Sequence, residues 1–214
     1  MKTRYILVLI TLISLFSLRA TAQFKENNSI YANFGYRVGT FKGPYTGFSW
    51  IVHQKLSFHF NYRSLSRKST NIPTDYNPGL GDALASLLSF GLAKERIKDY
   101  SREMSFGVGY SLPLNKKKTI RFHPKIHYTQ FSITEPGDWE YDHSASMFDP
   151  NYTYRMKRRQ AQGFTLNASL EFPFSQAFGI TIDPHATLLD GEISGGCMIG
   201  VMIGLLHGTN PKNK

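Results

Sequence analysis

Four side chains that could do chemistry alternate along TIRFHPKIHYTQFSIT, residues 119–134: Arg121, His123, Lys125 and His127. Guanidinium and ammonium groups could hold an anion, and imidazole could bind a metal ion or carry a proton. His123 and His127 would stand roughly 13 Å apart along an extended strand, which is too far for one zinc ion to bridge. The sequence therefore predicts no metal site and no cofactor.

A second reactive set lies in DPHATLLDGE, residues 183–192, where His185 and Thr187 share one face of an extended chain and Glu192 follows. Hydroxyl, imidazole and carboxylate groups are the parts of a nucleophilic hydrolase. Threonine stands where a serine nucleophile would be expected, so we favour a protein that is not an enzyme. An enzyme that uses His185, Thr187 and Glu192 is kept as an alternative.

Segments that alternate between apolar and polar residues must position these groups. In residues 55–64, for example, Leu56, Phe58, Phe60 and Tyr62 alternate with Ser57, His59, Asn61 and Arg63. This period of two predicts β-strands with one apolar and one polar face. Eight segments share the pattern, most of them near the roughly 10 residues that a tilted strand needs to cross a bilayer: 29–40, 46–53, 55–64, 102–112, 119–134, 162–174, 177–189 and 192–206.

The connections between these segments alternate in length. Links 53–55, 115–118 and 175–176 are short, whereas links 41–45, 65–101 and 135–159 are longer, and only the last link, 190–192, departs from the alternation. The longer links therefore leave from one end, as in outer-membrane barrels with short periplasmic turns and longer external loops. Pro124 and Pro184 lack a backbone donor and predict a bulge or a local break in the strand ladder.

The first 22 residues have the layout of a secretory signal peptide: basic Lys2 and Arg4, an apolar run, and the small-residue pattern Ala20-Thr21-Ala22. We expect residues 1–22 to be removed and residues 23–214 to form one domain. The chain has a formal charge of +10 and one cysteine, Cys197, so no internal disulfide framework is expected. Nucleic acid is not an expected partner of an exported protein.

Two barrels fit this pattern, and they differ in which face points inward. A soluble barrel would place the apolar face inside, and a membrane barrel would place it against lipid. Glycines crowd the polar faces and aromatic residues cluster near the strand ends, which favours the membrane form. We predict an all-β, eight-stranded antiparallel transmembrane barrel whose lumen holds Arg37, His59, Arg63, Glu103, Arg121, His123, Lys125, His127, Glu171 and Asp183.

The signal, the eight alternating strands and the unequal links resemble the OmpA-like family of small outer-membrane β-barrels over residues 29–206, and the ending TAQ resembles exports of Bacteroidetes. The resemblance implies the bacterial outer membrane as location and a terminal assembly signal, for which Gly200, Ile203 and Leu205 are in place without the usual final aromatic residue. Some barrels of this size are lipid A deacylases, which is the enzyme class that the alternative set would serve.

The lumen of eight strands has room for side chains rather than for an aqueous channel. Glu103, Glu171 and Asp183 would pair there with the arginines and Lys125. We interpret these residues as a network that fills the barrel, and a narrow pore for a small anion is the alternative, because cations exceed acids in the set.

The longer links suggest the partners. Leu80, Leu84, Leu87, Leu88 and Leu92 have helical spacing within residues 80–98, predicting a helix that caps the barrel mouth or lies on the outer leaflet or a partner. Cations at the same rim would meet lipopolysaccharide phosphates: Arg67, Lys68, Arg102, Arg155, Lys157, Arg158 and Arg159. The leading hypothesis is a non-enzymatic envelope protein with a structural, adhesive or complex-forming role, whose external loops contact an envelope protein partner.

Overall fold

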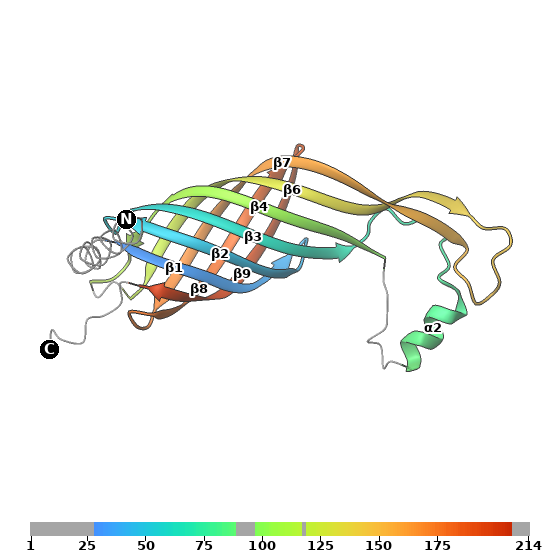
Figure 1. The fold of residues 1–214 in the computed structure, drawn as a ribbon, viewed down its shortest axis with the longest axis horizontal. Coiled ribbons are helices and arrows are strands. Elements are labelled where there is room, and N and C mark those ends of the chain that lie inside the picture. Colours follow the sequence, from blue (N-terminus) through green and yellow to red (C-terminus); the bar gives the residue numbers. More distant parts are fainter. Residues whose placement is uncertain (1–27, 89–96, 117–118, 207–214) are drawn as a thin grey trace, which may run out of the picture.

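The computed structural model describes residues 28–88, 97–116 and 119–206 of the 214-residue chain. The predicted signal peptide and Leu92 lie outside these residues. Eight long strands and one helix dominate the described chain (Figure 1): β1 (Ser29–Gly39), β2 (Gly43–Val52), β3 (Leu56–Lys68), α2 (Gly79–Leu88), β4 (Lys98–Tyr110), β6 (Arg121–Tyr141), β7 (Tyr152–Pro173), β8 (Phe178–Leu189) and β9 (Glu192–Leu205). A two-residue strand, β5 (Leu112–Pro113), lies between β4 and β6.

Antiparallel pairing closes the strands into a barrel. Each long strand pairs with its neighbour along the chain, β1 pairs with β9 from Ile30–Leu205 to Gly39–Gly196, and β4 pairs directly with β6. Closure leaves no free edge within the barrel wall, so every wall strand has a partner on both sides. The prediction of an eight-stranded antiparallel barrel is confirmed.

Alternate residues of the barrel wall are buried and exposed, and the buried ones are polar. On β3, Ser57, His59, Asn61 and Arg63 are buried, whereas the apolar residues between them are exposed or half-buried. The neighbouring strand β4 shows the same pattern: the apolar Phe106 is 53% exposed, whereas the charged Glu103 is 2% exposed. The polar face is therefore the interior, as the sequence predicts.

Both prolines interrupt the ladder as predicted. The β7–β8 pairing passes from Asn167–His185 to Leu170–Ile182 and omits Pro184. On β6, the pairing with β4 stops at Lys125, and the pairing with β5 begins at Phe122. Because proline has no backbone N–H, Pro124 falls where β6 changes partner.

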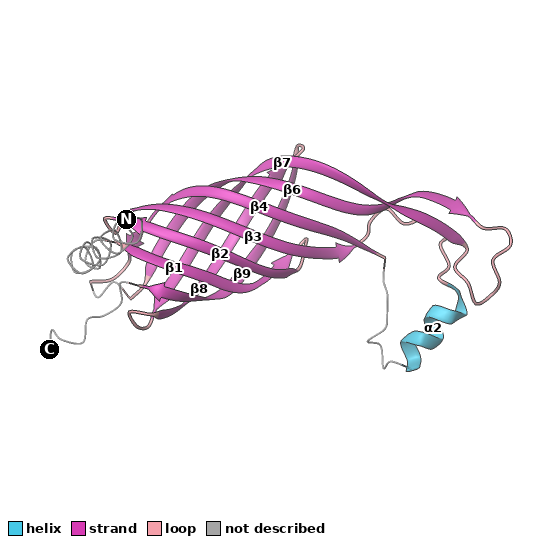
Figure 2. Cartoon of the chain, in the orientation of Figure 1, coloured by secondary structure: helices cyan, strands magenta, loops and turns pink. Residues whose placement is uncertain are grey.

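The two ends of the barrel differ. One end, which we call the turn end, carries the connections 53–55, 111–120 and 174–177. At the opposite end, β6 and β7 continue together past the wall and form an arm, which we define as residues 134–159 with the segment 69–88 that lies against its tip (Figures 1 and 2). Hydrogen bonds from Leu80 N to Met147 O and from Gly81 N to Phe148 O attach the start of α2 to this tip.

The arm shows that the predicted bounds of the links 135–159 and 65–101 are wrong. Residues 135–159 are not one long loop, because β6 pairs with β7 as far as Tyr141–Tyr152 and only residues 142–151 connect them. Likewise, β3 extends to Lys68 and β4 begins at Lys98, within the predicted link 65–101. Beyond the wall, residues 153–159 of β7 are exposed at every position, so the apolar–polar alternation that identifies a half-buried strand is lost there.

The helix also differs from its prediction. Helix α2 ends at Leu88, and Lys98, the last residue of the predicted helical range 80–98, belongs to β4. Figure 1 shows α2 beyond the barrel at the far end of the arm, so this helix does not cap the barrel mouth. Among the described residues, no helix has the length and apolar content needed to cross a membrane.

Candidate functional site

The lumen near the arm end is organised around Glu103. Its carboxylate accepts hydrogen bonds from Arg37 Nη1 at 3.0 and 3.1 Å and from Arg63 Nη1 at 3.0 Å. All three side chains are almost completely buried, and they come from β1, β3 and β4. One carboxylate therefore ties three strands together across the interior, and two guanidinium groups share its single negative charge.

Nearer the turn end, Glu171 collects the remaining cations. Tyr31 donates a 2.6 Å hydrogen bond to Glu171 Oε1, and His123 Nδ1 lies 3.0 Å from the same oxygen. Arg121 and Lys125 form ion pairs with Glu171 at 3.1 and 3.7 Å. Lys125 Nζ also lies 3.9 Å from Asp183 Oδ2, so the acids predicted for the lumen share its cations.

A chain of hydrogen bonds runs across the lumen through two histidines. Ser49 Oγ lies 2.9 Å from His59 Nδ1, His59 Nε2 lies 2.8 Å from Ser57 Oγ, and Ser57 Oγ lies 2.6 Å from His123 Nε2. His123 then reaches Glu171, so Ser57, His123 and Glu171 stand in the order of a catalytic triad. Ser57 is 0% exposed and held between two imidazoles, so a substrate carbonyl cannot reach its Oγ.

His127 completes the polar interior. Its Nδ1 lies 3.1 Å from Asn167 Oδ1, and its Nε2 lies 3.3 Å from Asn61 Nδ2. Gly107 stands opposite His127 on β4, and a methyl group there would collide with the imidazole ring. The glycines of the polar faces thus make room for the large polar side chains of neighbouring strands.

The alternative catalytic set is not brought together. His185 Nδ1 lies 3.3 Å from the Asp183 backbone oxygen, Thr187 Oγ1 lies 3.0 Å from Thr165 Oγ1, and Glu192 is exposed opposite Leu189. No hydrogen bond or ion pair of the described chain joins these three residues. Nor do the described His, Cys, Asp and Glu side chains include a group of three arranged to hold a metal ion.

The predicted basic rim divides into paired and unpaired cations. Arg67 pairs with Asp99 at 2.8 Å, Lys157 with Asp138 at 2.5 Å, and Arg159 with Asp190 at 2.9 Å. The other four form no ion pair with a described acidic residue: Lys68, Arg102, Arg155 and Arg158. Positive charge is therefore available at part of the rim only.

The aromatic residues of the arm pack mainly on one another. The Trp139 ring lies 4.9 Å from Tyr154 and 5.7 Å from Tyr76, centroid to centroid, and Tyr141 lies 5.2 Å from Tyr152. Tyr152 also donates hydrogen bonds of 2.8 and 3.0 Å to the Asp75 carboxylate, which raises the pKa of the Tyr152 phenol. These contacts fix segment 69–78 against β7.

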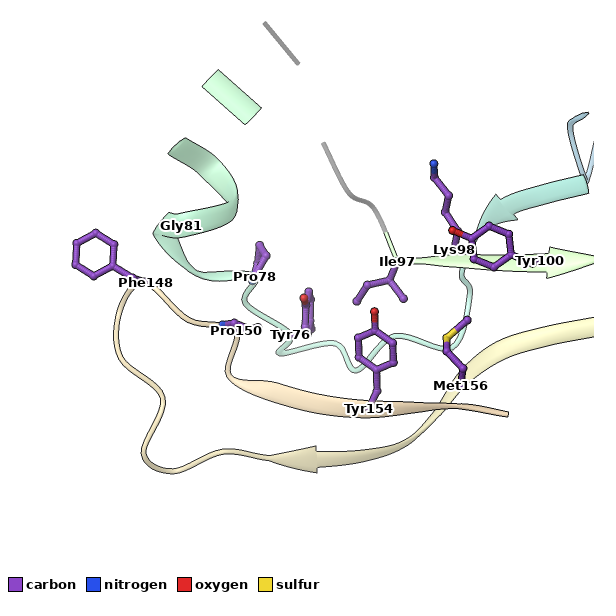
Figure 3. Close-up of a pocket in the computed structure, with 10 residues that line it drawn as sticks. All are labelled: Tyr76, Pro78, Gly81, Ile97, Lys98, Tyr100, Phe148, Pro150, Tyr154 and Met156. Atoms are coloured by element: carbon purple, nitrogen blue, oxygen red, sulfur yellow. The ribbon is translucent and has the colours of Figure 1, made fainter. Parts of the chain in front are cut away.

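A cleft of about 440 Å³ opens between residues 76–81, the start of β4 and residues 148–156 (Figure 3). The side chains of Tyr76, Tyr154 and Ile97 converge in it, whereas the Phe148 ring points away. Lys98 contributes a cation to the lining. On α2, Leu80, Leu84, Leu87 and Leu88 remain 46–80% exposed, so the described part of the helix leaves an apolar face uncovered.

No family model and no curated protein matches the chain. Similar solved structures include the N-terminal β-barrel domain of Pseudomonas aeruginosa OprF (10% identity, 83% of this chain and 96% of that one, TM-score 0.49) and Neisserial surface protein A (8%, 83%, 96%, 0.48). Another is Ail, the attachment invasion locus protein of Yersinia pestis, in complex with the heparin analogue sucrose octasulfate (10%, 82%, 95%, 0.44). Similarity of this degree supports no functional conclusion.

The serine–histidine chain was not predicted from the sequence, although alternation places each of its members on the inner face. Ser57 is opposite Gly109, which is opposite Lys125, so His123 is two residues away from the directly facing position. The contact depends on strand registers and on the space above two glycines. The only available signal was the combination of inward serines and histidines with glycines on the strand between them.

Proposed function

We propose that this chain is an OmpA-like, non-enzymatic β-barrel of the bacterial outer membrane that carries an external arm with a structural, adhesive or complex-forming role. The observation that carries the proposal is the inverted polarity of the wall: charged residues fill the interior while large apolar residues face outward. Phe34, Phe48, Phe58, Phe106 and Leu166 belong to this outer face, which comes from different strands and forms an apolar belt.

A belt of this kind suits lipid better than water. Soluble monomers rarely expose contiguous apolar patches larger than a few hundred Å², and closed pairing satisfies the backbone groups that hydrocarbon cannot. In this orientation the arm is external, the turn end is periplasmic, and the rim cations face lipopolysaccharide. Residues 1–22 would be the cleaved signal peptide, and Gly200, Ile203 and Leu205 on β9 would form the assembly signal.

The contacts in the lumen favour a barrel filled with side chains over an anion pore or a lipid A deacylase. Glu103 and Glu171 each tie several strands together through buried cations, which a conducting pore would have to separate. An anion pore would need that rearrangement, and a lipid A deacylase would need an accessible nucleophile. We therefore assign the external contacts to the arm and the rim.

The arm offers features suited to a partner. Its cleft combines aromatic rings with Lys98, and α2 exposes leucines at its far end. Aromatic residues with polar groups are typical anchors of binding surfaces. We propose an envelope or surface partner for this region, in keeping with an adhesive or complex-forming role.

Labelling of intact cells tests this orientation. In a Cys197→Ala background, Ser144→Cys places a thiol on the arm, and Gln176→Cys places one in a turn of the other end. A membrane-impermeant maleimide should label the arm thiol in intact cells and the turn thiol only after lysis. The proposal fails if both thiols react equally in intact cells or if neither variant is found in the outer membrane.

A further inference from the structure

A groove of about 690 Å³ lies on the outer wall where β4, β6 and β7 leave the apolar belt towards the arm. Its lining includes Arg102 and Arg158 together with Tyr62 and Met104. Tyr62 and Met104 are partly exposed outward-facing residues, and Phe106 continues the same face of β4 into the belt. The groove therefore joins two guanidinium groups to an apolar surface.

Ser132 brings the two arginines together. On β4, Arg102 is the direct cross-strand partner of Ser132, and such partners on one face have Cβ atoms about 5 Å apart. From β7, Arg158 donates from Nε to Ser132 Oγ at 2.8 Å, which leaves its two terminal NH₂ groups available. The two guanidinium groups thus flank one hydroxyl.

The charge of the groove is not neutralised by protein. Among the described residues, neither Arg102 nor Arg158 forms an ion pair with an acid, unlike Arg67, Lys157 and Arg159 of the same rim. Asp190 also lines the groove, but its carboxylate is held by Arg159 Nη1 at 2.9 Å. Gln130, Gln160 and Gln162 add neutral amide groups around the two cations.

We infer that this groove binds the phosphate group of an outer-leaflet lipid, with Arg102 and Arg158 on the phosphate and acyl chains along Met104 and the belt below. Guanidinium groups pair with phosphate through two parallel hydrogen bonds. The inference rests on the proposed membrane placement and narrows the predicted contact with lipopolysaccharide from seven rim cations to two.

The test measures binding of bisphosphorylated lipid A to purified full-length protein in detergent, by native mass spectrometry at several lipid concentrations. Arg102→Gln/Arg158→Gln should raise the Kd about tenfold or more. Lys68→Gln/Arg155→Gln removes the same charge from unpaired rim cations outside the groove and should change it less than twofold. Dephosphorylated lipid A should bind the unaltered protein as weakly as bisphosphorylated lipid A binds the groove variant.

Equal losses in the two double variants would overturn the inference, because general charge would then explain binding. Unchanged affinity of the groove variant would overturn it as well. Displacement of lipid A by inorganic phosphate at equal concentration would assign the groove to the free anion instead of a lipid. A heat-dependent gel shift of every variant shows that the barrel is folded, so these failures are distinct from failure of the membrane placement itself.

Discussion

Glu103 and Glu171 divide the buried cations of the lumen between them. Loss of either carboxylate should cost more stability than loss of an exposed one. Arg37 and Arg63 are 1% and 0% exposed, so water cannot compensate for the loss of Glu103. Removing one member of a buried ion pair leaves an unbalanced charge in a region of low dielectric constant. We therefore expect the network to fix strand positions more than it adds net stability.

Glu103→Gln should therefore lower the free energy of unfolding by about 3–5 kcal/mol. Unfolding in urea, followed by tryptophan fluorescence and by the gel shift of the folded barrel, measures this change. The matched control is Glu135→Gln, which removes the 3.5 Å contact with the half-exposed Arg159. That exposed pair is worth at most about 1 kcal/mol. Comparable losses in the two variants would show that Glu103 does not hold a buried network.

The inner-face residues of the candidate site could be predicted from the sequence, but their contacts could not. Alternation alone places Arg37, Glu103 and Glu171 on one face of their strands. Which cation meets which acid depends on the register between strands: Glu103 faces Arg63 directly on β3 but reaches Arg37 across the lumen. The sequence alone does not determine those registers.

At the scale of elements, the arm shows where sequence patterns stop being informative. The strands of the wall are predictable because one face is buried, so that polarity alternates. Residues 134–141 and 152–159 are also paired, with a register shift between Gly137 and Glu140, yet residues 153–159 are exposed at every position, so polarity does not alternate with burial there. Polar–aromatic content, not alternation, marks this part of the chain.

The attachment of segment 69–78 to the arm predicts a dependence on pH. The hydrogen bond to Asp75 raises the pKa of Tyr152, so its stabilising effect is fully present below the ordinary tyrosine pKa of about 10 and is lost as the pH rises through the raised value. Absorbance at 295 nm is followed as the pH is raised, and the curve of Tyr152→Phe is subtracted from that of the unaltered protein. The difference should have its midpoint above pH 10. Asp75→Asn should bring that midpoint down. A midpoint at or below pH 10 in the unaltered protein would contradict the contact.

At the scale of the whole molecule, the chain reverses the usual arrangement of polar and apolar groups. Its long-range organisation follows from closure of the sheet, which pairs β1 with β9, and we propose lipid as the surroundings of the belt. Length, alternation and the positions of short turns were enough to predict this architecture. They could not reveal the arm, because its existence depends on how far two strands continue past the wall.

A single charge introduced into the belt should show whether lipid or water surrounds it. Leu166→Arg on β7 places a cation at an outward position that is 60% exposed. It should destabilise the folded protein by about 2–4 kcal/mol if that position lies near the bilayer midplane. Gln162→Arg, at an exposed position of the same strand nearer the arm, should cost about 0–1 kcal/mol. Folding titrations in lipid vesicles measure both, and equal small effects would argue against burial in lipid.

We propose that the polar interior and apolar exterior belong to a closed barrel in the outer membrane. The most direct measurement expresses the chain with residues 1–22, isolates the outer-membrane fraction, and compares unboiled with boiled samples on a gel. We expect a band in that fraction that migrates differently before and after boiling. A soluble product whose migration does not change on boiling would contradict it.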